Sequence, residues 1–83
     1  MKITIVGTGY VGFSLAVLLA KEEKVFTLDI DKEKVDLINK KISPFKDKEI
    51  EDYLISQRLD LTATINKKIA YENASYIIVA TPT

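Results

Sequence analysis

Three glycines near the start of the chain have the spacing of a phosphate-binding turn. Gly7, Gly9 and Gly12 form the pattern G-x-G-x-x-G within residues 3–20, ITIVGTGYVGFSLAVLLA. In such a turn the first glycine permits a tight bend, the second lets the backbone approach a pyrophosphate, and the third lets a helix pack close to a strand. A helix that opens at Gly9 also directs unpaired N–H groups and its positive dipole end at the phosphates. The spacing therefore predicts a dinucleotide site.

An acidic residue follows the glycines at the distance expected of a ribose ligand. Asp29 directly follows the uncharged stretch 25–28, VFTL, and no arginine comes directly after it. Its carboxylate can accept hydrogen bonds from ribose hydroxyls, and it would repel a 2′-phosphate about 4 Å away by roughly 4 kcal/mol per charge pair. The cofactor predicted is therefore NAD rather than NADP. A nucleotide-free domain of the same fold, with the glycines kept for packing and Asp29 a turn residue, remains an alternative.

The elements that must position these residues change type at the glycines. Ile3, Ile5 and Val6 are β-branched and favour a strand, whereas residues 13–20 are rich in Leu, Ala and Val and favour a helix. A helix over residues 10–20 would be about 17 Å long, against roughly 30 Å of bilayer hydrocarbon. We therefore expect a strand, a turn and a buried helix, with Tyr10 and Phe13 packing on the sheet, and not a signal sequence or membrane anchor.

The rest of the chain alternates between strand and helix patterns. Further strands are expected over residues 25–28, 61–65 and 76–80, and the apolar run YIIVA in the last one predicts cover on both faces. Asp31 can cap a helix that runs to about Lys40, and Val35, Ile38 and Ile42 share its apolar face. After Ser43 and Pro44, Asp47 can cap a second helix, and Asn66 can cap a third through Tyr71.

This order of elements predicts the fold class. Alternating strands and helices indicate a doubly wound α/β fold with a parallel sheet, and right-handed crossovers favour the strand order 3-2-1-4. The 83 residues are thus expected to form the first, Rossmann-like half of a dinucleotide-binding domain with one further strand, truncated after the fourth strand.

Composition narrows the function further. Twelve basic residues balance twelve acidic ones, so nothing favours nucleic acid or a membrane surface as a partner. The chain has no cysteine and no histidine, so we expect no metal site and no thiol or imidazole chemistry. A cytoplasmic binding domain is the expectation.

Longer runs of sequence resemble one known family. MKITIVGTGYVG, LDIDKEKVDLINKKISP, DKEIEDYL and AYENASYIIVATPT are similar, in this order, to the start of the UDP-glucose/GDP-mannose dehydrogenase family, and most of all to its bacterial members that act on UDP-glucose. The similarity covers the whole chain, with Phe13 standing where leucine is common. Carried over position by position, it implies NAD contacts at Gly7, Thr8, Gly9, Tyr10, Val11, Gly12, Asp29, Lys34 and Thr83. Without the resemblance, Lys34 is a surface partner of Asp31, three residues earlier on the same helix.

The resemblance also implies a reaction. Family members oxidise a nucleotide sugar, here UDP-glucose to UDP-glucuronate, with two NAD per turnover and with a cysteine, a lysine, an asparagine and an aspartate supplied by later sequence. The chain has no cysteine. We therefore expect residues 1–83 to be the N-terminal part of an NAD-binding domain, with no catalytic residue of its own, inactive alone and homodimeric when complete.

Other assignments remain open at this stage. An NAD-sensing module of the potassium-transport type also begins with strand, glycine turn, helix, strand and acid, although it usually has a single helix before the third strand. Hydroxyacyl and phosphogluconate dehydrogenases are built on the same half-fold. Within the family, GDP-mannose and UDP-N-acetylmannosamine are alternative substrates.

Overall fold

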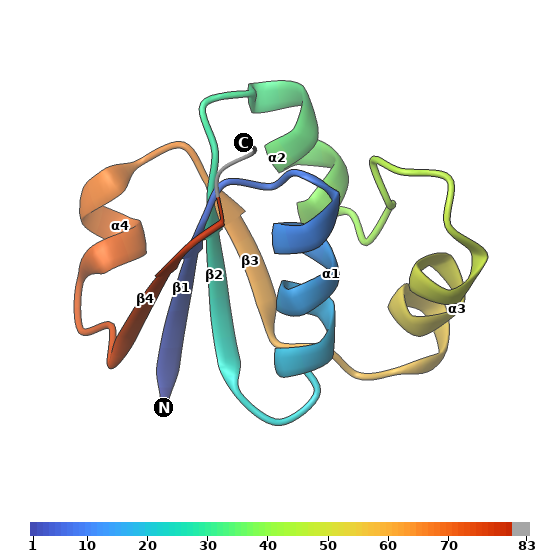
Figure 1. Cartoon of the computed structure of the whole chain (residues 1–83), viewed down its shortest axis with the longest axis horizontal. Helices are drawn as coiled ribbons and strands as arrows, with labels where there is room; N and C mark the ends of the chain where they lie inside the picture. Colours follow the sequence, from blue (N-terminus) through green and yellow to red (C-terminus); the bar gives the residue numbers. More distant parts are fainter. Residues whose placement is uncertain (81–83) are drawn as a thin grey trace.

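A four-stranded parallel sheet with helices on both faces makes up the chain (Figure 1). The structure is a computed structural model, and it describes residues 1–80. Its elements in chain order are β1 (Lys2–Val6), α1 (Tyr10–Leu19), β2 (Lys24–Leu28), α2 (Lys32–Asn39), α3 (Lys48–Ser56), β3 (Leu61–Thr64), α4 (Lys67–Tyr71) and β4 (Tyr76–Val79).

The sheet has the predicted strand order, β3-β2-β1-β4. The register pairs Val6 at the end of β1 with Leu28 at the end of β2 and with Val79 at the end of β4. All strands run in the same direction, so their carboxyl ends meet at one edge. In doubly wound folds this is the edge that carries the ligand.

The core lies between the sheet and helices α1 and α2 on one face, with α3 packed against α1, while α4 lies on the other face (Figure 1). Ile5, Phe13, Val25 and Ile38 are fully buried there, as residues with apolar side chains on facing elements should be. Phe13 packs as predicted. On the opposite face the Thr4 hydroxyl donates to the carbonyl of Ala70 and ties α4 to β1.

The three predicted helix caps are present, and α2 ends within one residue of the expected Lys40, which is its C-cap. Asp31, Asp47 and Asn66 each accept a hydrogen bond from a backbone N–H in the first turn of their helices. Helix α2 ends at Asn39 because Lys41 adopts a left-handed conformation, with φ of 61°, and turns the chain. The prediction that Ile42 belongs to the apolar face of α2 is therefore wrong, and this side chain is 49% exposed.

Strand β4 is less covered than its apolar sequence predicts. Tyr76, Ile77 and Val79 are all more than half exposed, and only Ile78 packs against the core. In the described part of the chain β4 pairs with β1 alone. The expected cover on both faces is therefore absent from these residues. Among residues 1–80, no helix combines the length and apolar character needed to span a bilayer.

Candidate cofactor site

The turn between β1 and α1 uses its glycines for two different purposes. Gly7 has a φ of 96°, a conformation that L-residues with side chains rarely adopt, and its N–H donates to the Leu28 carbonyl at 2.9 Å. A Cβ at Gly12 would lie 2.4 Å from the Gly7 carbonyl oxygen and 3.0 Å from the Ala80 Cβ. Gly12 therefore allows α1 to approach the end of the sheet.

Gly9 has a different environment. A Cβ placed there would meet nothing within 4 Å in the described structure, so packing does not require a glycine at this position. Gly9 is the N-cap of α1 and has no side chain to satisfy the first N–H groups of the helix. Open space in front of unpaired N–H groups at a helix start suits an anionic group, and a side chain at Gly9 would enter this space.

Asp29 connects the turn after β1 with the turn after β2. Its Oδ2 accepts from the Thr8 N–H at 3.0 Å and from the Thr8 hydroxyl, while Oδ1 accepts from the Asp31 N–H at 2.8 Å. Partial burial raises the pKa of the carboxyl, but the hydrogen bonds from Thr8 and Asp31 and the charge of Lys34 outweigh it, so the pKa is lowered overall. Asp29 is therefore an anion at neutral pH.

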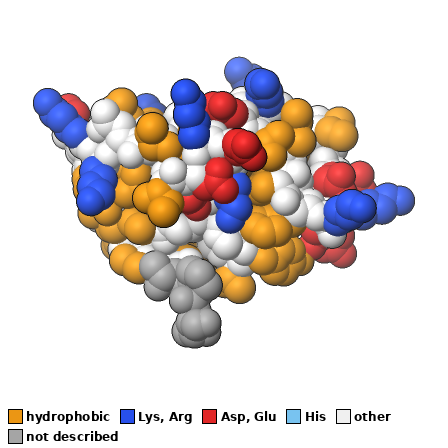
Figure 2. Space-filling model, turned by 90° about the horizontal axis from the view of Figure 1, so that it is seen from above, with side chains coloured by type: hydrophobic (Ala, Val, Ile, Leu, Met, Phe, Trp, Pro, Cys, Tyr) orange, Lys and Arg blue, Asp and Glu red, His pale blue; other side chains and the backbone are white. Residues whose placement is uncertain are grey.

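These residues line one hollow at the carboxyl edge of the sheet. Figure 2 looks down on this edge, where charged side chains stand among hydrophobic ones. The hollow is lined by Val6, Gly7, Thr8, Gly9, Leu28, Asp29, Ile30, Lys34, Ile65, Lys67 and Tyr71. The structure thus brings together Gly7, Thr8, Gly9, Asp29 and Lys34, five of the residues expected to contact NAD.

Four more residues line this hollow that the sequence did not indicate as site residues: Ile30, Ile65, Lys67 and Tyr71. Ile30 is 98% exposed, and Ile65 directly follows β3. Their positions just beyond the ends of neighbouring parallel strands are a usable signal, because ligands of doubly wound sheets bind there. The mixture of apolar side chains with one carboxylate and two lysines suits a flat aromatic ring joined to a polar, negatively charged group.

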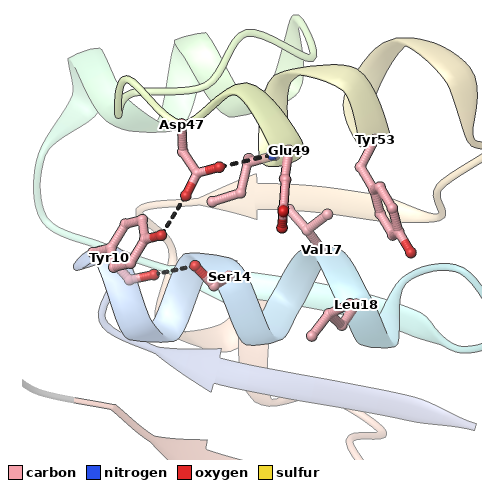
Figure 3. Close-up of a pocket in the computed structure, with 8 residues that line it drawn as sticks. Tyr10, Ser14, Val17, Leu18, Asp47, Glu49 and Tyr53 are labelled. Carbon is pink, nitrogen blue, oxygen red and sulfur yellow. Dashed lines mark hydrogen bonds between the residues drawn. The ribbon is translucent and has the colours of Figure 1, made fainter.

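Tyr10 and Val11 do not line this hollow with their side chains. Tyr10 was expected to pack on the sheet, but it lies on the face of α1 that meets α3, and its hydroxyl donates to the Asp47 carboxylate across a second hollow (Figure 3). Val11 is 74% exposed. Both residues belong to the first turn of α1, where they contribute backbone N–H groups. Gly12 does not line the hollow; its backbone packs against the Gly7 carbonyl on the helix side of the turn. Thr83 lies outside the described residues.

The site fits a dinucleotide with a free ribose 2′-hydroxyl. Gly9 leaves room for a pyrophosphate, and Asp29 presents a carboxylate at the end of β2. No group of His, Cys, Asp or Glu side chains within residues 1–80 could hold a metal ion.

The chain is similar to known proteins in both sequence and fold. The sequence model of the UDP-glucose/GDP-mannose dehydrogenase family, NAD binding domain, matches residues 1–83. The chain is 49% identical over 83 residues to UDP-glucose 6-dehydrogenase of Streptococcus pneumoniae, and 49% identical over 85 aligned residues to that of Campylobacter jejuni. The whole chain is aligned in both, but it spans only 21% and 22% of these proteins.

A solved structure agrees with these sequence matches. The crystal structure of a ternary complex of GDP-mannose dehydrogenase from Pseudomonas aeruginosa aligns with the whole chain at a TM-score of 0.90 and 31% identity. The chain covers 20% of that protein. The predicted resemblance, the Rossmann-like fold and NAD as the cofactor of the family domain are confirmed. The match favours this family over the NAD-sensing and hydroxyacyl alternatives.

Proposed function

The chain belongs to the UDP-glucose/GDP-mannose dehydrogenase family as its NAD-binding domain, and from this we propose that its residues hold NAD for a UDP-glucose 6-dehydrogenase. The relatives that are 49% identical carry that name. We assign cofactor binding to Gly7, Thr8, Gly9, Gly12, Asp29, Lys34, the first turn of α1 and Thr83. The four residues that the sequence did not indicate, Ile30, Ile65, Lys67 and Tyr71, are added as the lining of the same hollow.

The observation that carries this proposal is the carboxylate of Asp29. It stands at the end of β2, is held from two sides by Thr8 and Asp31, and has a lowered pKa. A fixed anion there can accept hydrogen bonds from the adenosine ribose, and it opposes a 2′-phosphate. Ile30, Ile65 and Tyr71 offer apolar surface to the adenine ring, and Lys34 and Lys67 bring positive charge near the phosphates.

The pyrophosphate would occupy the open space at Gly9. The first N–H groups of α1 point out of the helix end and have no intrahelical acceptors. Together with the helix dipole they can bind an anion without a charged side chain. NAD, once bound, serves as the hydride acceptor. The residues described here bind and orient it.

The complete protein is proposed to oxidise UDP-glucose to UDP-glucuronate and to reduce two NAD per turnover, as a cytoplasmic homodimer. The chain spans about a fifth of the curated relatives it matches. It contains no cysteine to act as the nucleophile of this reaction, so residues 1–83 alone are proposed to be inactive.

The test of cofactor binding is an NAD and NADP titration of the complete protein with two Asp29 variants. Asp29→Ala removes the charge and the acceptor of Thr8, and it should weaken NAD binding by about 1.5–3 kcal/mol, roughly 10- to 150-fold. Asp29→Asn keeps an acceptor oxygen for Thr8 but loses the charge, so it should bind NADP better than the unaltered protein does. Unchanged NAD affinity in both variants would exclude Asp29 as the ribose ligand.

The test of the substrate is NADH formation with three nucleotide sugars: UDP-glucose, GDP-mannose and UDP-N-acetylmannosamine. We expect oxidation of UDP-glucose, with two NADH formed per UDP-glucuronate. Preference for either other sugar would leave the cofactor site as proposed and correct the substrate.

A further inference from the structure

The connection between α2 and α3 places an aromatic ring beside the cofactor hollow. Phe45 lies in this connection, is half-buried and packs against the core. Its ring centroid is 5.7 Å from that of Tyr10, edge to face, and 6.2 Å from that of Phe13. Both partners are on α1, just after the glycine turn. Phe45 therefore joins the α2–α3 connection to the start of the helix that faces the phosphates.

The backbone around Phe45 is fixed locally. The Ser43 hydroxyl donates to the Phe45 carbonyl at 2.7 Å and accepts from the Phe45 N–H at 3.1 Å. Two residues later, Asp47 caps α3 and accepts a hydrogen bond from the Tyr10 hydroxyl (Figure 3). This hydrogen bond raises the pKa of the Tyr10 phenol and lowers that of Asp47, so Asp47 is ionised and the phenol is the donor. The ring thus has a defined position relative to α1.

A lysine that lines the cofactor hollow, Lys34, lies over the ring of Phe45. The Lys34 ammonium lies 5.7 Å from the centroid of Phe45, within the range of a cation–π contact. Lys34 lines the hollow, and its charge helps to lower the pKa of Asp29. A lysine side chain loses considerable rotamer freedom when it is fixed. A ring already fixed beside it offsets part of that loss before any ligand binds.

We propose that Phe45 is a positioning residue for the cofactor: its ring holds Lys34 at the hollow beside Asp29. This rests on the proposed function, in which Lys34 binds NAD. The ring acts through its negatively charged face and not through packing alone. A lysine without this platform would spend more of its time in solvent, and NAD would have to order it on binding.

The experiment measures NAD affinity by calorimetric titration of the complete protein in four forms: unaltered, Phe45→Leu, Lys34→Met and the double variant. Phe45→Leu should raise the Kd about 2- to 5-fold, which corresponds to the ~0.5–1 kcal/mol of an exposed cation–π contact. With Lys34 already replaced, the same change at Phe45 should have no further effect. Phe26→Leu is the matched control, because Phe26 is also half-buried under a lysine, Lys2 at 4.1 Å, but outside the hollow.

Fluorinated phenylalanines at position 45 test whether the ring acts through its charged face or through packing alone, with little change in how the protein folds. Each fluorine withdraws charge from the ring face with little change of shape, so the Kd should rise stepwise with fluorine number when Lys34 is present. A flat series, or an equal effect of Phe45→Leu with and without Lys34, would show that Phe45 acts by packing only. If the unaltered protein did not bind NAD, the proposed function itself would fail, and the positioning role with it.

Discussion

Alanine substitution at Gly12 and at Gly9 should separate the packing role of one glycine from the binding role of the other. The Cβ of Gly12→Ala would lie 2.4 Å from the Gly7 carbonyl oxygen, so α1 or the turn must move. Overpacking of this kind costs about 1–3 kcal/mol or more, and the better helix propensity of alanine returns up to ~1 kcal/mol. A net loss of about 1–2 kcal/mol is expected, or a 5- to 30-fold larger unfolded fraction.

At Gly9 the expected result is the reverse. The new Cβ meets nothing within 4 Å, and the φ of −66° suits any residue, so stability should change only through the weaker N-cap. NAD binding should suffer, because the methyl group enters the space assigned to the pyrophosphate.

Hydrogen exchange of peptides from β1 and α1 reports the local opening free energy, and an NAD titration of the same proteins reports binding. Gly12→Ala should exchange about 5- to 30-fold faster than the unaltered protein in these peptides, whereas Gly9→Ala should exchange nearly like it. Equal exchange in the two variants, or undiminished NAD affinity in Gly9→Ala, would refute the assignment.

Three further predictions concern stability and association. Thr27 is fully buried in β2, and its hydroxyl finds no hydrogen-bond partner among the described residues, so Thr27→Val should stabilise the domain by about 1 kcal/mol in urea unfolding. Thr4→Val should instead destabilise the domain by about 1–3 kcal/mol, because the Thr4 hydroxyl does donate to the Ala70 carbonyl. Effects of the same sign in the two variants would contradict both predictions. The pKa of Asp29 is lower in the folded chain than its ordinary value of 3.8, so its contribution to stability is complete above that value and is lost as the pH falls through the folded pKa. The free energy of unfolding of Asp29→Asn should therefore fall less steeply between pH 5 and pH 2 than that of the unaltered protein. Parallel stability curves for the two proteins would count against a lowered pKa of Asp29. The isolated 83-residue chain should associate through the exposed β4, and Val79→Lys should reduce the associated fraction in sedimentation, since a charge on an edge strand opposes pairing. If the unaltered chain and the variant were both monomeric, β4 would be excluded as an association surface.

Features that depend on neighbouring residues could be read from the sequence. Asp31, Asp47 and Asn66 were predicted as caps because an N-cap contact spans only two or three residues. The strand order followed from the alternation of elements and the handedness of crossovers. Asp29 was identified because the turn after β2 places it beside the turn after β1 in any fold of this class.

Features that depend on tertiary packing could not be read in this way. The positive φ of Lys41, which leaves Ile42 outside α2, is not indicated by a glycine in the sequence. Tyr10 faces α3 because of its angular position on α1, which only the placement of α3 reveals. Phe45 sits in a loop with no periodic pattern, so its contact with Lys34 is visible only once the chain is folded. These are the parts of the site in which residues distant in sequence meet.

The double engagement of Asp29 limits how the cofactor preference of this protein could change, whether by evolution or by engineering. An exchange of Asp29 for an apolar residue would remove the negative charge and also take away the acceptor of Thr8 on one side and of Asp31 on the other. A path to NADP use would therefore pass most easily through asparagine, which loses the charge but keeps one acceptor oxygen, before a cation could be added nearby. Exchanges that skip this step should loosen the turn that carries Gly7 and Gly9, and lose affinity for both cofactors together.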